Sequence, residues 1–270
     1  MQTSHNIHKA GVIYNQRKEG SNMAKNTFER KENKFLISSE QYNSLLPVLI
    51  ENMNYDNYCT DGGYSVYNIY YDTDNNDIIR HSLSKPFFKE KLRMRSYTIP
   101  QSMDEFVFVE LKKKINGTVS KRRATITLEE AYNFIDKGIR PEVSEYIDEQ
   151  VINEIEYFLS VNKVKPAIYL SYDRIAMFDK ANTKFRVTID TNIQTRRTDV
   201  KLEGGPYGKQ LLDKNQYLME VKIDGGMPIW LANKFSELKI FSTSFSKYGT
   251  EFKGFLIKQN ESEKYEKTTA

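Results

Sequence analysis

The chain has 270 residues, of which 39% are hydrophobic and 13% aromatic, and this is ample material for one large folded core. The 40 Lys and Arg residues against 36 Asp and Glu leave a net charge of only +4, which excludes the global polycation that coats nucleic acid. The single cysteine, Cys59, excludes a disulfide framework. The 3 histidines are too few and too separated for a His-based metal site or a Ser-His-Asp triad.

The ends of the chain differ in character from its middle. Residues 1–26 are polar and aperiodic, and we expect a disordered leader there. Met23 is a possible true start of translation, because Lys18-Glu19-Gly20 can be encoded by a purine-rich ribosome-binding sequence; the alternative is an ordinary disordered tail. We assign 27–257 to one folded domain and 258–270 to a flexible tail. With no apolar run of about 18 residues and no signal-peptide pattern, we expect a soluble, cytoplasmic protein.

Hydrophobic periodicity predicts an α+β fold. Predicted strands cover 28–37 and 64–73, three segments within 87–128, and segments around 165–174, 184–188 and 220–222. Helices are predicted from Ser38, over 75–84, from Thr127 to about Gly138, over 144–162, from Pro228 and over 244–255. Two of these helices open with a capping box, Ser38 with Gln41 and Thr127 with Glu130.

The segment 87–128 organises the chain. In its first strand Lys91, Arg93 and Arg95 alternate with Leu92 and Met94, and successive side chains of a strand point to opposite faces. The next two strands continue the pattern, with Glu110, Lys112 and Lys114 in one and Lys121, Arg123, Thr125 and Thr127 in the other. Each strand therefore has one charged face and one face that is apolar or mixed.

The charged faces predict a tunnel. An ordinary two-layer sheet would expose them to solvent, but two cations about 6 Å apart at an effective dielectric constant near 20 repel by roughly 3 kcal/mol, and a solvated face would disperse them. The downstream helices also need an apolar sheet face to pack on. We therefore predict an antiparallel β-barrel with helices outside and a cationic lumen that binds a polyanion.

Carboxylate–cation units recur along the predicted strands. They are Arg30-x-Glu32-x-Lys34, Glu110-x-Lys112 and Glu220-x-Lys222, joined by further cations such as Arg174 and Arg186. About ten cations against three carboxylates suit a triphosphate or a phosphate chain, with a divalent ion on one or two of the carboxylates.

At this point the chain resembles a known family, the vacuolar transporter chaperone (VTC) domain of polyphosphate polymerases within the triphosphate tunnel metalloenzymes (CYTH-like). The resemblance runs from about Phe28 to Phe255. Beyond the three units above, its carriers are Lys91-Leu92-Arg93-Met94-Arg95-Ser96-Tyr97, Lys121-Arg122-Arg123, Tyr172-Asp173-Arg174 and Ser244-Phe245-Ser246-Lys247-Tyr248. Each motif is weak alone, but seven in order are specific.

The resemblance implies a metal-dependent phosphotransferase that moves the γ-phosphate of ATP to a growing polyphosphate chain, with Mn²⁺ or Mg²⁺. It implies catalytic phosphate contacts from Arg93, Arg95, Lys112, Lys121, Arg174, Arg186 and Lys222. Substrate-binding candidates are Arg30, Lys34, Lys91, Arg123, Tyr172, Ser246 and Lys247. Metal candidates are Glu220, which matches the family's metal-binding glutamate, with Glu32 and Glu110. Relatives that hydrolyse triphosphates or cyclise ATP carry Glu where Arg30 stands, and this departure favours transfer.

Several alternatives stay open. The chain could be a tunnel triphosphatase or nucleotidyl cyclase, or a polyphosphate-binding module without catalysis, and a membrane partner could receive the product. Glu32, Glu110 and Glu220 could be structural ion-pair partners. The Tyr-rich strand at 64–73 is better explained as core and sheet surface than as a base-stacking platform. The Gly-rich stretch near Gly204 resembles a P-loop, but Glu203 and Gln210 occupy required Gly and Ser/Thr positions, so we predict a loop turn.

Overall fold

The computed structural model describes residues 31–59, 62–116, 118–143 and 145–269, with only the backbone at 31 and 262–269. The candidate residue Arg30, the expected leader and the possible start at Met23 lie outside this part of the chain.

One large antiparallel sheet forms the body of the molecule. Its main strands are β1 (Lys31–Ser38), β3 (Tyr64–Asp72), β4 (Phe88–Ser96), β5 (Phe106–Ile115), β6 (Thr118–Thr127), β7 (Lys165–Asp179), β8 (Arg186–Arg196) and β10 (Gln216–Ile223). Three short strands complete it: β2 (Met53–Tyr55), β9 (Lys209–Gln210) and β11 (Ser242–Thr243). The order is β11-β1-β10-β8-β7-β3-β4-β5-β6, with β2 on β7 and β9 on β8.

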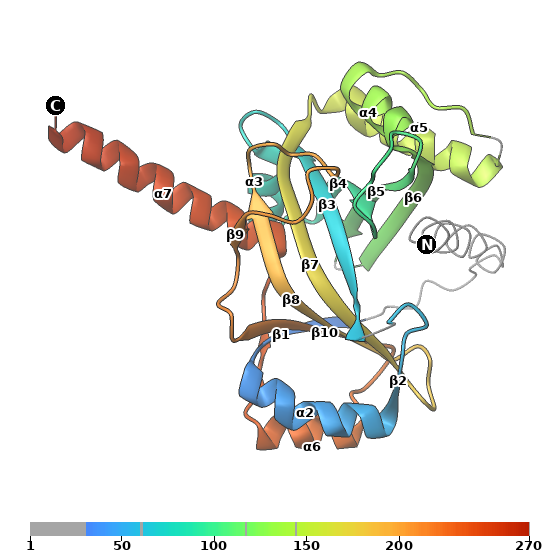
Figure 1. Cartoon of the computed structure of the whole chain (residues 1–270), viewed down its shortest axis with the longest axis vertical. Helices are drawn as coiled ribbons and strands as arrows, with labels where there is room; N and C mark the ends of the chain where they lie inside the picture. Colours follow the sequence, from blue (N-terminus) through green and yellow to red (C-terminus); the bar gives the residue numbers. More distant parts are fainter. Residues whose placement is uncertain (1–30, 60–61, 117, 144, 270) are drawn as a thin grey trace.

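Helices cover the outer face of this sheet at its two ends (Figure 1). α2 (Ser39–Asn52) and α6 (Ile229–Glu237) lie beneath β1 and β10, and α4 (Leu128–Lys137) and α5 (Tyr146–Val161) lie over β5 and β6. α3 (Asp77–Leu83) packs against α7 (Lys247–Thr269), which extends away from the body. The α+β architecture with helices outside is confirmed.

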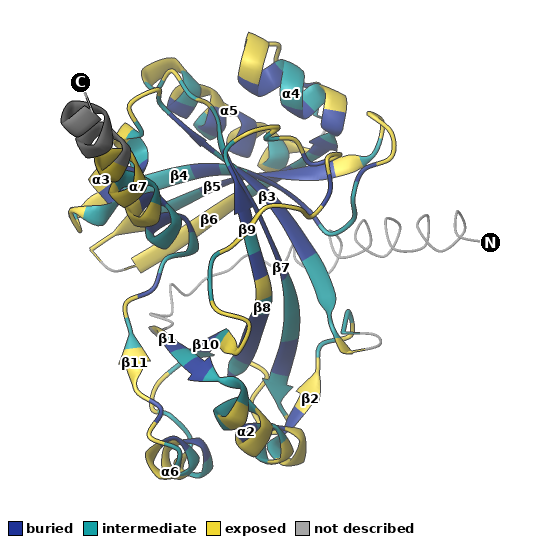
Figure 2. Ribbon diagram, turned by 60° about the vertical axis from the view of Figure 1, so that its left-hand side comes forward, coloured by how far each residue is buried: buried dark blue, intermediate teal, exposed yellow. Residues whose placement is uncertain are grey.

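Apolar and cationic side chains alternate along β4 and face opposite sides of the sheet, as predicted. Leu92 and Met94 are 0% exposed and belong to the core beneath α4 and α5, while Arg93 and Arg95 face the opposite side. Figure 2 shows buried residues concentrated along the strands, with exposed residues on the outer faces of the helices. Burying two such side chains contributes about 1.5 to 3 kcal/mol each, which fixes the direction in which the cations point.

Both capping boxes are confirmed. The Ser38 hydroxyl accepts from the Gln41 amide at 3.1 Å, and Thr127 accepts from the Glu130 amide at 3.2 Å, with the reciprocal side-chain bonds present. Gly138 ends α4 with a φ of 70°, a left-handed conformation that favours glycine.

The sheet is strongly curved, in agreement with the predicted fold class, and within the described residues no hydrogen-bonded ladder joins its edge strands β6 and β11. Two expectations need correction. The last helix begins at Lys247 rather than Ser244 and continues to Thr269, since a polar sequence can stay helical without an apolar stripe. α5 begins at Tyr146, and its N-cap is Glu145, which makes no side-chain cap bond.

Candidate active site: a cationic cavity inside the curved sheet

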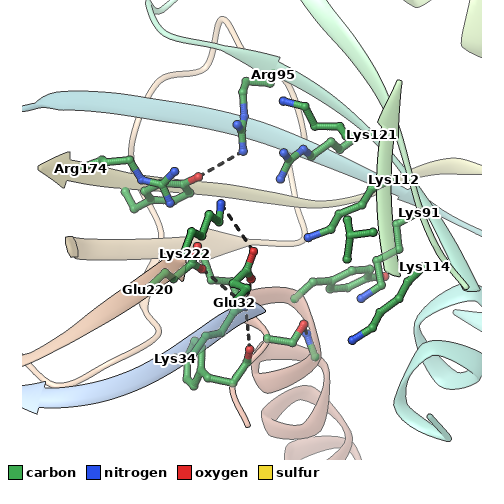
Figure 3. Close-up of a pocket in the computed structure, with 18 of the residues that line it drawn as sticks. Glu32, Lys34, Lys91, Arg95, Lys112, Lys114, Lys121, Arg174, Glu220 and Lys222 are labelled. Atoms are coloured by element: carbon green, nitrogen blue, oxygen red, sulfur yellow. Dashed lines mark hydrogen bonds and ion pairs between the residues drawn. The ribbon is translucent and has the colours of Figure 1, made fainter. Parts of the chain in front are cut away.

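The inner face of the sheet encloses a cavity of about 2160 Å³. Among the described residues, fifteen Lys and Arg but only four Asp and Glu line it. Figure 3 shows ten of the lining residues converging from the strands around the cavity. So large an excess of cations in a walled space produces a strong positive potential, because the low-dielectric walls focus the field.

Nearly all of the predicted site residues meet in this cavity. They are Glu32, Lys34, Lys91, Arg93, Arg95, Lys112, Lys121, Arg123, Tyr172, Arg174, Arg186, Glu220, Lys222, Ser246 and Lys247. They come from β1, β4, β5, β6, β7, β8 and β10 and from the segment that opens α7, and so only the tertiary fold brings them together. Glu110 is the exception among the described candidates and does not line the cavity.

Glu110 lies behind the lining, fully buried, as the centre of an ion-pair cluster. One of its carboxylate oxygens accepts from Arg93 Nε at 2.6 Å, and the other from Arg123 Nε at 2.7 Å and Lys121 Nζ at 3.2 Å. Burial alone would raise the pKa of Glu110, but Arg93, Arg95 and Arg123 outweigh burial and hold it well below its usual range. Glu110 therefore orients these cations towards the cavity.

Glu220 and Glu32 form a second group on the neighbouring strands β10 and β1. The Glu220 carboxylate lies 3.5 Å from Lys34 Nζ and 3.6 Å from Lys247 Nζ, and Glu32 lies 3.4 Å from Lys34 Nζ and 3.5 Å from Lys222 Nζ. Burial would raise the pKa of Glu220, but Lys247, Lys34 and Arg174 hold it well below its usual range. Glu220 is therefore ionised at neutral pH.

The model of the VTC domain matches residues 29–255, which include every site residue described above. The chain belongs to the VTC domain family. A relative, subunit 4 of the vacuolar transporter chaperone complex of Schizosaccharomyces pombe, is 27% identical over 173 residues. The match covers 57% of this chain and 23% of the relative, so the chain spans about a quarter of the length of that protein.

Solved structures match this chain at low sequence identity. A Bacillus halodurans protein proposed to be an adenylate cyclase has a TM-score of 0.48 and 15% identity, covering 81% of this chain and 95% of that one. The mimivirus capping-enzyme triphosphatase has a TM-score of 0.35 and 11% identity, covering 86% of this chain and 97% of that one.

Sequence reasoning missed one buried carboxylate of this VTC domain, Asp190 in β8. It binds the Arg174 guanidinium through both oxygens, at 2.6 and 2.7 Å, and Lys247 Nζ at 2.5 Å. Burial would raise the pKa of Asp190, but Arg174 and Lys247 lower it. The sequence did contain a pattern that indicates this position. Arg186, Thr188 and Asp190 are spaced two residues apart, so Thr188 and Asp190 lie on the same face of the strand as the predicted site residue Arg186.

The Tyr-rich strand of the VTC domain divides between core and cavity. Tyr67 and Tyr71 belong to the core beneath α4 and α5, whereas Tyr64 and Tyr70 line the cavity. The Tyr70 hydroxyl accepts from Arg93 at 3.2 Å. Burial would raise the pKa of Tyr70, but Arg93 and Arg95 lower it to about 8. Tyr70 thus belongs to the site rather than to the core alone.

The Gly-rich stretch near Gly204, which resembles a P-loop in sequence, forms a structural turn. Arg196 Nη1 donates to the Gly205 carbonyl at 2.7 Å and to the Tyr207 carbonyl at 3.1 Å. A Cβ at Gly208 would come within 2.4 Å of the Thr195 carbonyl oxygen, so only glycine fits there. These residues do not line the cavity.

The donor atoms near Glu220 suit a divalent cation. Glu220 and Glu32 offer carboxylate oxygens, which Mg²⁺ and Mn²⁺ prefer. Thr188 lies opposite Glu220 in the β10–β8 ladder, and its buried hydroxyl has no hydrogen-bond partner within the described residues. No group of three or more Asp, Glu, His or Cys in that part of the chain gathers as a complete metal site. Phosphate oxygens would have to complete the coordination.

Proposed function

We propose that this VTC domain is a polyphosphate polymerase, a metal-dependent phosphotransferase that transfers the γ-phosphate of ATP to a growing inorganic polyphosphate chain. The observation that carries the proposal is the cavity itself, in which fifteen cations face four carboxylates among the described residues. Membership of the VTC domain family and similarity to a vacuolar transporter chaperone subunit support it. A site of this charge and size suits a chain of phosphates better than one small anion.

The reaction needs alignment and charge more than covalent help from the protein. A terminal oxygen of the acceptor chain attacks the γ-phosphorus of ATP, the bond to the bridging oxygen of the β-phosphate breaks, and ADP leaves with the electron pair. Arg93, Arg95 and Arg174 supply planar, bidentate donors to the equatorial oxygens of the transferred group. Lys112, Lys121, Arg186 and Lys222 neutralise the charge along the donor and acceptor.

Pre-organisation of these cations is the second contribution of the chain. Glu110 and Asp190 hold Arg93, Arg123 and Arg174 at hydrogen-bond distance, so these side chains do not need to reorganise when the phosphates arrive. Lys34, Lys91, Tyr172, Ser246 and Lys247 line the same cavity and complete the proposed substrate contacts. Arg30, outside the described residues, stays a proposed contact from the sequence alone.

The proposed metal ligands are Glu220 and Glu32. A bound Mn²⁺ or Mg²⁺ would supply Lewis-acid neutralisation of the phosphate oxygens. Glu110 is a poorer candidate than the sequence suggested, because both of its oxygens already bind Arg and Lys side chains.

The decisive experiment is incubation of the purified protein with ATP and Mn²⁺, followed by electrophoresis on a polyphosphate gel. We expect a ladder of chains whose length grows with time. Orthophosphate alone would support a tunnel triphosphatase, a cyclic nucleotide would support a cyclase, and binding without turnover would support a polyphosphate-binding module.

No helix in the described part of the chain is long and apolar enough to cross a bilayer. We propose a cytoplasmic site of action, with ATP and polyphosphate as ligands, no nucleic-acid partner, and a membrane protein as a possible recipient of the product.

A further inference from the structure

A second cavity, of about 490 Å³, lies on the outer face of the sheet beside α4. Within the described parts of the chain it shares no lining residue with the cationic cavity. Its walls come from α4, from the first residues of β7, from the segment that follows β8 and from the connection between β4 and β5. Cavities of this size hold small organic ligands. We call this one the outer cavity.

Two carboxylates line the outer cavity, and no cation among the described residues forms an ion pair with either. They belong to Asp136 of α4 and to Glu203 in the segment that follows β8. Glu203 accepts a hydrogen bond from the Tyr132 hydroxyl at 2.8 Å, and burial raises the pKa of Asp136 despite the adjacent Lys137. Carboxylates held in a walled space without a cationic partner attract a cation.

A buried hydroxyl points towards the same place. Tyr71 is 1% exposed, and its hydroxyl has no hydrogen-bond partner in the described part of the chain. Tyr71 stands opposite Pro166 in the β3–β7 ladder, and Pro166 lines the outer cavity. Burial, together with the nearby Tyr132, Asp136 and Glu203, raises the pKa of Tyr71 well above its usual value. The hydroxyl is therefore directed to the floor of the outer cavity, where a ligand can satisfy it.

Two lysines at the edge of the outer cavity leave these carboxylates accessible. Lys165 binds Asp74 in the connection between β3 and α3, and its side chain is 64% exposed. Lys201 is exposed as well. Water screens charges in such positions, so they oppose a cation inside the cavity only weakly.

The remaining walls decide between a metal ion and an organic cation. In the part of the chain that the structure describes, no group of three or more Asp, Glu, His or Cys gathers as a metal site. Met103, Pro166 and Val200 instead give the outer cavity apolar walls, which suit hydrocarbon rather than the water shell of a metal ion. A primary ammonium group has three donors, and two carboxylates and one phenolic oxygen are three acceptors.

We propose that the outer cavity is a binding site for a small organic ammonium ion. The charged group donates to the Asp136 and Glu203 carboxylates and to the Tyr71 hydroxyl. The hydrocarbon part packs against Met103 and Val200. This site is separate from the proposed phosphate chemistry, because the two cavities have no lining residue in common among the described residues.

The test uses 1-pentylamine as the probe and 1-pentanol as its uncharged counterpart. Calorimetry with the full chain, at neutral pH and fixed ionic strength, measures both Kd values. We expect saturable binding of pentylamine and at least about tenfold weaker binding of pentanol, because an alcohol makes no charge-assisted hydrogen bonds. The Asp136→Asn variant should bind pentylamine at least about tenfold more weakly for the same reason.

The Tyr71→Phe variant supplies a second measurement, in which binding and stability change independently. It should bind pentylamine about fivefold more weakly or worse, yet its midpoint of urea denaturation without ligand should be unchanged or higher, because the deleted hydroxyl has no partner. The control is Tyr67→Phe, on the same face of β3 and in the same core, which should leave pentylamine binding unchanged.

Four results would overturn the site. They are equal affinities for pentylamine and pentanol, an unchanged affinity in Asp136→Asn, an unchanged affinity in Tyr71→Phe, and a lower midpoint of denaturation in Tyr71→Phe than in Tyr67→Phe, which would mean that the hydroxyl already has a partner. None of these measurements involves phosphate transfer. The site can therefore fail while the polymerase proposal stands, and the reverse.

Discussion

Replacing Glu110 by Gln should destabilise the empty protein and at the same time improve its binding of polyanions. The change keeps the shape of the side chain but removes the buried charge that neutralises Arg93, Lys121 and Arg123. Removing one partner from a buried ion-pair cluster costs about 3 to 5 kcal/mol, because the remaining charges stay desolvated and unpaired. For a protein of this size, such a loss lowers Tm by at least about 6 °C.

A matched control exists on the outer face of the same strands. Glu154 also binds two cations, Lys113 at 2.9 Å and Arg122 at 3.0 Å, but its side chain is 28% exposed. Exposure screens these pairs, so Glu154→Gln should cost less than about 1 kcal/mol. Urea denaturation of both variants measures the difference as a shift in the midpoint at constant slope.

The sign of the pH dependence gives a second measurement on the same variant. The pKa of Glu110 is lowered in the folded protein, so its ionised form contributes stability that is present above the unfolded pKa of about 4.3 and is lost as pH falls below that value. The Glu110→Gln variant should therefore be less stable than the unchanged protein at neutral pH, and the difference in their free energies of unfolding should be smaller in acid.

Tripolyphosphate should bind more tightly to this variant, because the released cations face the cavity. Equal destabilisation by the two substitutions, or weaker tripolyphosphate binding by Glu110→Gln, would refute this account of the cluster.

Four further outcomes are expected. Tripolyphosphate at about 100 times its Kd should stabilise the protein by roughly 2.7 kcal/mol, and a thermal shift no larger than that given by sulfate at matched ionic strength would count against the cavity as a polyanion site. Glu220→Gln should abolish metal-dependent turnover yet retain polyphosphate binding, and unchanged turnover would remove Glu220 from the site. Arg93→Ala should lower kcat/KM for ATP roughly ten- to a hundredfold in the folded fraction, and it should also cost stability because it removes a partner of the buried Glu110. Leu92→Ala on the other face should cost about 2 to 5 kcal/mol of stability and leave the kinetics of the folded fraction nearly unchanged; unchanged kinetics in Arg93→Ala with impaired kinetics in Leu92→Ala would mean that the strand faces are misassigned. Because burial lowers the pKa of Lys91 to about 8, polyphosphate affinity should fall between pH 7 and 9 as this lysine loses its charge, and Lys91→Arg should reduce that fall.

The strand faces and the starts of α2 and α4 could be predicted from the sequence because they depend on near neighbours in the chain. Alternation along 91–95 was enough to place Leu92 in the core and Arg93 in the cavity, since a strand has only two faces. The capping boxes at Ser38 and Thr127 are contained within four residues each. The length of α7 could not be predicted in this way, because its second half has no apolar stripe to mark it.

The roles of the carboxylates were decided only by the tertiary structure. Glu110-x-Lys112 and Glu220-x-Lys222 are the same pattern in the sequence, yet Glu110 is buried among cations and Glu220 lines the cavity. This difference arises from the residues that lie opposite each carboxylate on the adjacent strands. Arg93 and Arg123 stand opposite Glu110 on its two sides, whereas Lys34 and the uncharged Thr188 flank Glu220. The sequence of a strand determines which face of the sheet each of its side chains occupies. Whether a carboxylate on that face is neutralised depends on the charged residues of the adjacent strands, and these strands come from distant segments of the chain.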